Sequence, residues 1–140
     1  MPIEKSAGAV IFRKENGDFS YLLIQYGLGH WGFPRGLIEK GEELEETAKR
    51  EITEETGIKD FRFLQGFKET IKFFFKWKDE NILKFVTYFL AETKEEKIIL
   101  SYEHKDFAWL SYKKALAGLT HKTSREVLKR AYDYLMKRKA

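Results

Sequence analysis

The sequence of 140 residues contains no cysteine and only two prolines and two methionines. Without thiols it can form neither disulfide bonds nor thiolate metal sites, so any metal must be held by oxygen or nitrogen ligands. No stretch approaches the roughly 20 apolar residues of a membrane-spanning helix, and the first residues lack the long apolar run of a signal peptide. We therefore expect a cytoplasmic protein without a membrane partner.

The composition is that of a globular protein. Hydrophobic residues make up 43% of the chain and aromatic residues 16%, and a chain of this length can bury a sizeable core. We expect one domain, residues 1–140, that acts as a monomer. Charged residues reach 34%, dominated by Lys and Glu, with few Asn, Gln or Met. This balance resembles that of hyperthermophile proteins, a hypothesis that a melting temperature below about 65 °C would contradict.

The net charge of +4 arises largely near the end of the chain, where Lys and Arg outnumber the acids. Such a basic segment can bind nucleic acid. It can equally be the solvated face of an amphipathic helix. Apolar residues at helical spacing favour the second interpretation, so we do not expect a nucleic-acid partner; they are Val127, Leu128, Ala131, Tyr134 and Leu135. A positive surface can still attract polyphosphates.

Apolar runs separated by turn residues predict several strands. Asn16-Gly17 between two such runs is a strong hairpin signal. Strands are expected over 7–12, 21–26, 31–33, 61–75 with an interruption near residue 66, 82–91 and 107–110. Helices are expected over 42–56, after a cap at Ser111, and from about residue 124 to the end. Strands around one central helix, with another helix at the end, favour an α/β or α+β fold whose mixed sheet is covered on two faces.

The helix expected over residues 42–56 has a buried stripe at Leu44, Ala48 and Ile52, which recur every four residues. Gly57 supplies the left-handed residue that ends it. The acids in the first turn are favourable, because they lie at the positive end of the helix dipole.

The acids near the other end of this helix are unfavourable. Glu51 and Glu55 fall on or beside the apolar stripe and lie four residues apart, which costs roughly 0.2–0.5 kcal/mol even in water. Glu54 and Glu55 stand at the negative end of the dipole. Arg50 can pair with Glu54, which leaves Glu51 and Glu55 without a counter-charge. A solvated helix would scatter such acids on its outer face, whereas carboxylates around a partly buried point suit Mg²⁺ or Mn²⁺.

The segment resembles the signature of the Nudix hydrolase superfamily, G-x5-E-x7-R-E-U-x-E-E-x-G-U, in which U is a bulky aliphatic residue. Every defined position is filled, by Gly36, Glu42, Arg50, Glu51, Ile52, Glu54, Glu55, Gly57 and Ile58. The resemblance implies an αβα sandwich and a hydrolase of nucleoside diphosphates linked to another group, with Mg²⁺ or Mn²⁺ as cofactor. It also implies which groups bind the metal: Glu51, Glu54, Glu55 and the carbonyl of Gly36.

Further roles follow from the same resemblance. Arg50 would orient Glu51 or Glu54, and Glu42 would tie the preceding loop to the helix, although a first-turn acid needs no such role. Members of the family take as catalytic base either a glutamate of the signature or one from a distant loop. Glu103 is the distant candidate, and it is also a candidate metal ligand.

A second similarity spans residues 7 to about 110. Residues 31–36 read Trp-Gly-Phe-Pro-Arg-Gly and resemble the Trp-x-x-Pro-Lys-Gly segment of asymmetric diadenosine tetraphosphate hydrolases, with an arginine that changes the geometry of the cation. Residues 101–110 resemble their Ser-x-Glu-His…Trp-Leu segment. The similarity implies cleavage of diadenosine tetraphosphate to ATP and AMP.

Three other functions remain open. Enzymes with the same signature include RNA 5′-pyrophosphohydrolases and enzymes that hydrolyse oxidised nucleotides such as 8-oxo-dGTP. A binding module that senses a nucleotide without cleaving it is the non-enzymatic alternative. Such modules typically lose glutamates of the signature, and all of them are present here.

Candidate substrate contacts lie outside the signature. Polyphosphate contacts are expected from Arg35 and Lys84, with His30 as a weaker candidate. Lys84 can equally be a solvated lysine at a strand edge, and a lone histidine more often makes a local hydrogen bond. The aromatic run around Phe73 and Phe74 could stack on an adenine. Because side chains alternate between the faces of a strand, we expect only one or two of these rings to do so.

Overall fold

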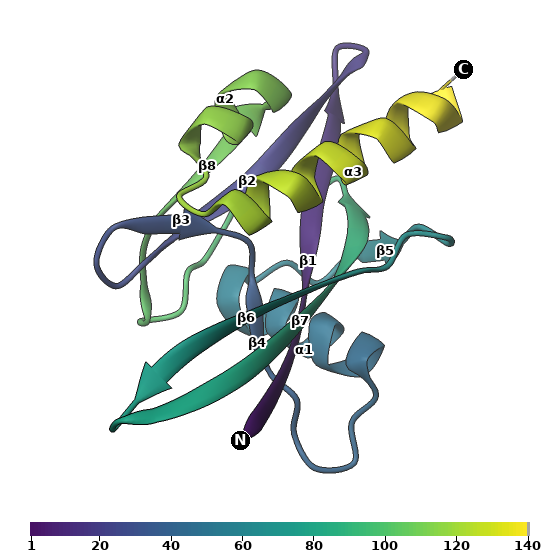
Figure 1. The fold of residues 1–140 in the computed structure, drawn as a ribbon. Coiled ribbons are helices and arrows are strands. Elements are labelled where there is room, and N and C mark those ends of the chain that lie inside the picture. Colours follow the sequence, from purple (N-terminus) through teal and green to yellow (C-terminus); the bar gives the residue numbers. More distant parts are fainter. Residues whose placement is uncertain (140) are drawn as a thin grey trace.

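The computed structural model describes residues 1–139, which form eight strands and three helices (Figure 1). The strands are β1 (Ile3–Glu15), β2 (Asp18–Tyr26), β3 (His30–Gly32), β4 (Arg35–Leu37), β5 (Phe61–Phe63), β6 (Glu69–Trp77), β7 (Glu80–Thr93) and β8 (His104–Ser111), and the helices are α1 (Leu44–Thr56), α2 (Tyr112–Gly118) and α3 (Lys122–Lys139). No helix in this described part is long and apolar enough to cross a bilayer.

The strands form one mixed sheet. Its order is β3-β2-β1-β7-β5, with β4 paired to β1, β6 to β7 and β8 to β2. β1 and β7 run parallel, whereas the other pairs are antiparallel. The hairpin expected at Asn16-Gly17 is confirmed, since both residues have positive φ, 49° and 80°, which suits a two-residue turn between twisted strands.

Helices cover both faces of the sheet, as expected for an αβα sandwich. Alternate residues of β1 point to opposite faces: Ala9 and Ile11 pack with Ile52 of α1, and Val10 and Phe12 pack in the cluster that α2 and α3 cover. Figure 1 shows α1 behind the sheet and α2 and α3 in front of it. Because alternate side chains point to opposite faces, β1 contributes to a separate hydrophobic core on each side of the sheet.

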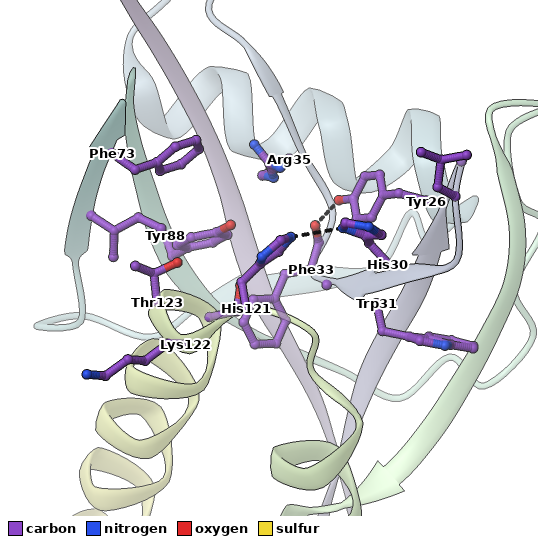
Figure 2. Close-up of a pocket in the computed structure, with 15 residues that line it drawn as sticks. Tyr26, His30, Trp31, Phe33, Arg35, Phe73, Tyr88, His121, Lys122 and Thr123 are labelled. Carbon is purple, nitrogen blue, oxygen red and sulfur yellow. Dashed lines mark hydrogen bonds between the residues drawn. The ribbon is translucent and has the colours of Figure 1, made fainter. Parts of the chain in front are cut away.

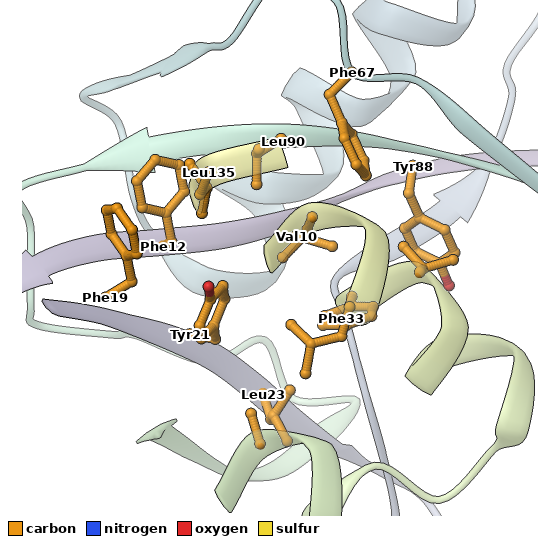
Figure 3. Packing of buried hydrophobic residues seen from close by; sticks show 14 of the residues in the cluster. Val10, Phe12, Phe19, Tyr21, Leu23, Phe33, Phe67, Tyr88, Leu90 and Leu135 are labelled. Carbon is orange, nitrogen blue, oxygen red and sulfur yellow. The ribbon is translucent and has the colours of Figure 1, made fainter. Parts of the chain in front are cut away.

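The larger core lies under α3 and is rich in aromatic rings, including Phe12, Tyr21, Phe33 and Tyr88 (Figure 3). The predicted apolar stripe of α3 is confirmed, because Val127, Leu128, Ala131 and Leu135 are buried there and Tyr134 packs, partly buried, against the same core. The lysines and arginines of this helix consequently lie towards solvent.

Several boundaries differ from those expected. α1 begins two residues later than predicted, because Glu43 is its N-cap and forms a capping box with Glu46. Gly57 ends the helix with a φ of 75°, as predicted. Neither β4 nor the turn between β6 and β7 was predicted. Lys78 and Asp79 form that turn with positive φ, which is uncommon for residues other than glycine.

Candidate functional site

Arg50 of α1 holds three glutamates. Its Nε and Nη2 donate to Glu42 at 2.8 and 3.0 Å, and its Nη1 donates to Glu51 at 2.7 Å and Glu54 at 3.1 Å. Nη2 also donates to the carbonyl of Leu37. The predicted pair with Glu54 is confirmed, but the expectation that Glu51 has no counter-charge is wrong. One guanidinium carries five donors, so it can serve several carboxylates at once.

Glu42 ties the loop before α1 to the helix. Its Oε1 accepts hydrogen bonds of 2.8 Å from the backbone of Glu39 and from the hydroxyl of Thr47. The hydrogen bond from Arg50 is the main reason that the pKa of Glu42 falls to about 2. Glu42 therefore stays ionised and keeps Arg50 in place beside the other acids.

Glu55 is buried on the inner face of α1, with 5% of its surface exposed. Its Oε1 accepts a 2.9 Å hydrogen bond from the backbone N–H of Arg35, and its Oε2 lies 2.9 Å from Nε2 of His104. Burial, with a further contribution from the charge of Glu51, raises its pKa to about 8. Burial also lowers the pKa of His104. Both groups are thus mainly uncharged at neutral pH unless a cation enters.

Glu51 lies directly against the backbone of β4. A Cβ atom added at Gly36 would fall on the carboxylate of Glu51, so a glycine is needed for this close approach. Burial raises the pKa of Glu51, and the contact with Arg50 partly offsets this effect.

The four predicted carboxylates line one cavity of about 600 Å³, here called the acid cavity. Glu51, Glu54 and Glu55 reach it from α1, and Glu103 reaches it from the turn before β8. The charge of Glu103 contributes to the raised pKa of both Glu51 and Glu55. Residues from two distant segments therefore share one anionic site.

The donors of the acid cavity fit a hard divalent cation. Within residues 1–139, no three His, Asp or Glu side chains converge in a geometry that could hold a metal ion. In this structure, Glu51 and Glu54 each accept a hydrogen bond from Arg50, and Glu55 lies against His104. The donors are nevertheless carboxylate oxygens, which Mg²⁺ and Mn²⁺ prefer. Burial disfavours the charged forms of Glu51 and Glu55 and so raises their pKa values. A bound cation would stabilise those charged forms.

A second hollow of about 560 Å³, here called the aromatic cleft, lies on the α3 side of the sheet (Figure 2). Phe73 and Tyr88 stand on one side of the opening and Tyr26 on the other, with Trp31 and Phe33 lower in the view of Figure 2. Its polar lining residues include His30, His121, Lys122 and Thr123.

Tyr26 and Arg35 line both the acid cavity and the aromatic cleft. The Arg35 guanidinium lies 5.7 Å from the centre of the Tyr26 ring. The Tyr26 hydroxyl donates to the carbonyl of Phe33, and its ring packs edge-on against His104 at 4.7 Å. A cation and a fixed aromatic ring therefore stand where the two hollows meet.

The structure brings some predicted substrate residues together and leaves others apart. Phe73 and His30 line the aromatic cleft, and Arg35 lies at its junction with the acid cavity. Phe74 does not line either hollow, because it points to the opposite face of β6 and is 63% exposed. Lys84 lines neither hollow, because the parallel pairing of β1 and β7 places it beside Glu4, 3.6 Å from its carboxylate.

Four site residues were not identified from the sequence as functional: Tyr26, Tyr88, His104 and His121. Nδ1 of His30 lies 3.2 Å from Nε2 of His121, and this contact joins the start of β3 to the residue before α3. The two histidines are 91 positions apart, so no local pattern could pair them. His104, in contrast, follows Glu103 directly, and that position was the available signal.

Comparison with known proteins gives a family match and relatives that cover most of the chain. A family model described as the NUDIX domain matches residues 2–131. The bis(5'-nucleosyl)-tetraphosphatase [asymmetrical] of Mus musculus is 31% identical over 143 residues, which cover 94% of this chain and 95% of that protein. The crystal structure of a C. elegans Ap4A hydrolase binary complex superposes with a TM-score of 0.84 at 29% identity, covering 96% of this chain and 98% of that one. An 8-oxo-dGTP diphosphatase of Buchnera aphidicola is 35% identical, but over only 61% of this chain.

Proposed function

Because this chain belongs to the Nudix hydrolase family, we propose that it cleaves diadenosine tetraphosphate asymmetrically, to ATP and AMP. The observation that carries this proposal is the junction of the two hollows at Tyr26 and Arg35. A base in the aromatic cleft would place its phosphate chain beside the Arg35 guanidinium and then over the acid cavity. The curated mammalian relatives that match over nearly the full length carry the name asymmetrical bis(5'-nucleosyl)-tetraphosphatase, which supports this proposal.

The acid cavity is the proposed place of reaction. Glu51, Glu54, Glu55 and Glu103, with the carbonyl of Gly36, would hold Mg²⁺ or Mn²⁺. When bound, such a cation neutralises charge on phosphate oxygens and lowers the pKa of a water molecule. Arg50 does not face the substrate in this scheme, because its donors are committed to three glutamates and a carbonyl. It is a positioning residue for Glu51 and Glu54.

Glu103 is the base that we propose. Glu51 and Glu54 each accept a hydrogen bond from Arg50, and Glu55 is engaged by Arg35 and His104. Glu103 is exposed at the tip of its turn and faces the same cavity. It would take a proton as the water oxygen bonds to the phosphorus next to one adenosine. The bond from that phosphorus to the bridging oxygen breaks, which releases AMP and ATP.

Identification of the reaction products tests whether cleavage is asymmetric. Purified protein with Mg²⁺ and diadenosine tetraphosphate is expected to yield equal amounts of ATP and AMP by ion-exchange chromatography, and excess EDTA is expected to stop the reaction. Formation of two ADP molecules, or no cleavage, would refute the substrate assignment. Turnover of 8-oxo-dGTP and of 5′-triphosphorylated RNA is expected to be slower, and a higher kcat/KM on either would favour that alternative.

Phe73→Ala should raise the KM for diadenosine tetraphosphate by about tenfold with little change in kcat. Stacking of a base on an aromatic ring contributes about 1–3 kcal/mol, and Phe73 is the ring of β6 that lines the aromatic cleft. Phe74→Ala is the matched control, since its side chain lies on the opposite face of the same strand. Steady-state kinetics on both variants test the assignment, and equal effects would contradict it.

A further inference from the structure

Tyr102 is an aromatic residue with almost no contact to the rest of the protein. Its side chain is 96% exposed, yet it lines the acid cavity next to Glu103. A single exposed aromatic residue is unremarkable by itself. Tyr102, however, lies in the wall of an anionic site. Binding of phosphates there does not require an apolar ring, so the ring indicates contact with another part of the ligand.

The turn that carries Tyr102 is tied to the end of α1. The backbone N–H of Ser101 donates to the carbonyl of Glu55 at 3.3 Å, and that of Ile99 donates to Thr56 at 2.9 Å. The turn is closed by the N–H of His104, which donates to the carbonyl of Ser101 at 3.1 Å. Tyr102 and Glu103 are therefore the two central residues of a β-turn whose base is fixed to the acid cavity.

A second exposed apolar side chain lines the same cavity. Leu37 of β4 is 52% exposed and, like Tyr102, does not line the aromatic cleft. The wall of the acid cavity thus carries two exposed apolar side chains, and neither of them lines the aromatic cleft. A ligand with one base in the aromatic cleft and its phosphates over the acids would bring a second base, at the far end of the phosphate chain, towards these side chains.

We propose that Tyr102 is a stacking platform for the second base of a dinucleoside polyphosphate, with Leu37 as a further apolar residue of the same cavity wall. The proposal rests on the proposed function and adds a specificity-determining residue to it. Tyr102 selects ligands with a base at each end of the phosphate chain over mononucleotides with the same number of phosphates. Glu103, the next residue, acts on the phosphates between them.

The test compares diadenosine tetraphosphate with adenosine 5′-tetraphosphate, which has the same four phosphates but one base. Tyr102→Ala is expected to raise the KM for the two-base substrate about tenfold. The KM of the one-base nucleotide, or its inhibition constant if it is not cleaved, is expected to stay unchanged. Tyr102→Phe keeps the ring and is expected to behave like the wild type. Phe73→Ala, in the other hollow, is expected to weaken both ligands.

Each outcome has a separate meaning. Equal effects of Tyr102→Ala on both nucleotides, or no effect on the two-base substrate, would overturn the platform. A Tyr102→Phe variant as impaired as Tyr102→Ala would show that the hydroxyl matters rather than the ring, and would also overturn it. Failure of the wild-type protein to cleave diadenosine tetraphosphate would instead reject the proposed function. Because Tyr102 is so exposed, the melting temperatures of its variants should match that of the wild type.

Discussion

Glu55→Gln is expected to reduce hydrolysis by about 100- to 1000-fold, the loss that follows removal of one preorganised electrostatic group at a reacting centre. The amide keeps the shape of the side chain and can still accept the hydrogen bond that the backbone of Arg35 donates. It cannot supply the negative charge that a divalent cation requires. The fold should therefore persist while catalysis is lost.

The same substitution should change how stability depends on pH. In EDTA, folded protein keeps a proton on Glu55 up to about pH 8, because burial and the charge of Glu51 raise its pKa from 4.5. The unfolded chain releases that proton near its ordinary value. The folded state thus binds more protons between these pH values, and the free energy of unfolding falls as pH rises through that window. Glutamine does not titrate, so this contribution disappears.

Chemical denaturation in EDTA from pH 5 to 9 measures this difference. Near pH 9 the Glu55→Gln variant should be more stable than the wild type by a few kcal/mol, since one pKa unit corresponds to about 1.4 kcal/mol. Glu45→Gln makes the same chemical change on an exposed part of α1 and serves as the control. It should keep both turnover and the wild-type pH profile. Full activity of Glu55→Gln would show that Glu55 does not bind the metal.

The sequence was sufficient to predict the part of the site that lies on one helix. Glu51 and Glu55 could be placed on the buried face because the period of α1 is fixed by Ala48 and Ile52, and all four are buried. Glu103 could be added because its segment resembled that of a known subfamily. In each case the signal was local in the chain.

The aromatic cleft depends on contacts that no local pattern contains. Its lining comes from the end of β2, from the face of β7 that carries Tyr88, and from His121 just before α3. Alternation predicted that Phe73 and Phe74 point apart, but the pairing of β6 with β7 decided which of them faces the cleft. The ion pair of Lys84 with Glu4 could not be predicted, because the two residues are 80 positions apart and adjacent only through the parallel pairing of β7 with β1.

Gly36→Ala is expected to reduce turnover by about 100-fold or more with little loss of stability. The added Cβ would occupy the position of the Glu51 carboxylate, which is the far end of a flexible side chain. Glu51 can rotate away at small cost to the fold, but it then leaves the proposed metal site. Replacing glycine by alanine where φ is not positive can even stabilise a protein slightly, through the unfolded chain.

Gly8→Ala provides the contrast, because Gly8 pairs with Arg35 one position along the same two strands. A Cβ there would meet the carbonyl of Pro34 and lie 2.8 Å from the Cα of Arg35, and a strand backbone cannot rotate away. The Gly8 variant should thus lose melting temperature, whereas the Gly36 variant should keep its melting temperature and lose kcat. Thermal denaturation and kinetics on both variants separate the two effects. Wild-type turnover by Gly36→Ala would mean that the position of Glu51 against β4 is not required for the reaction.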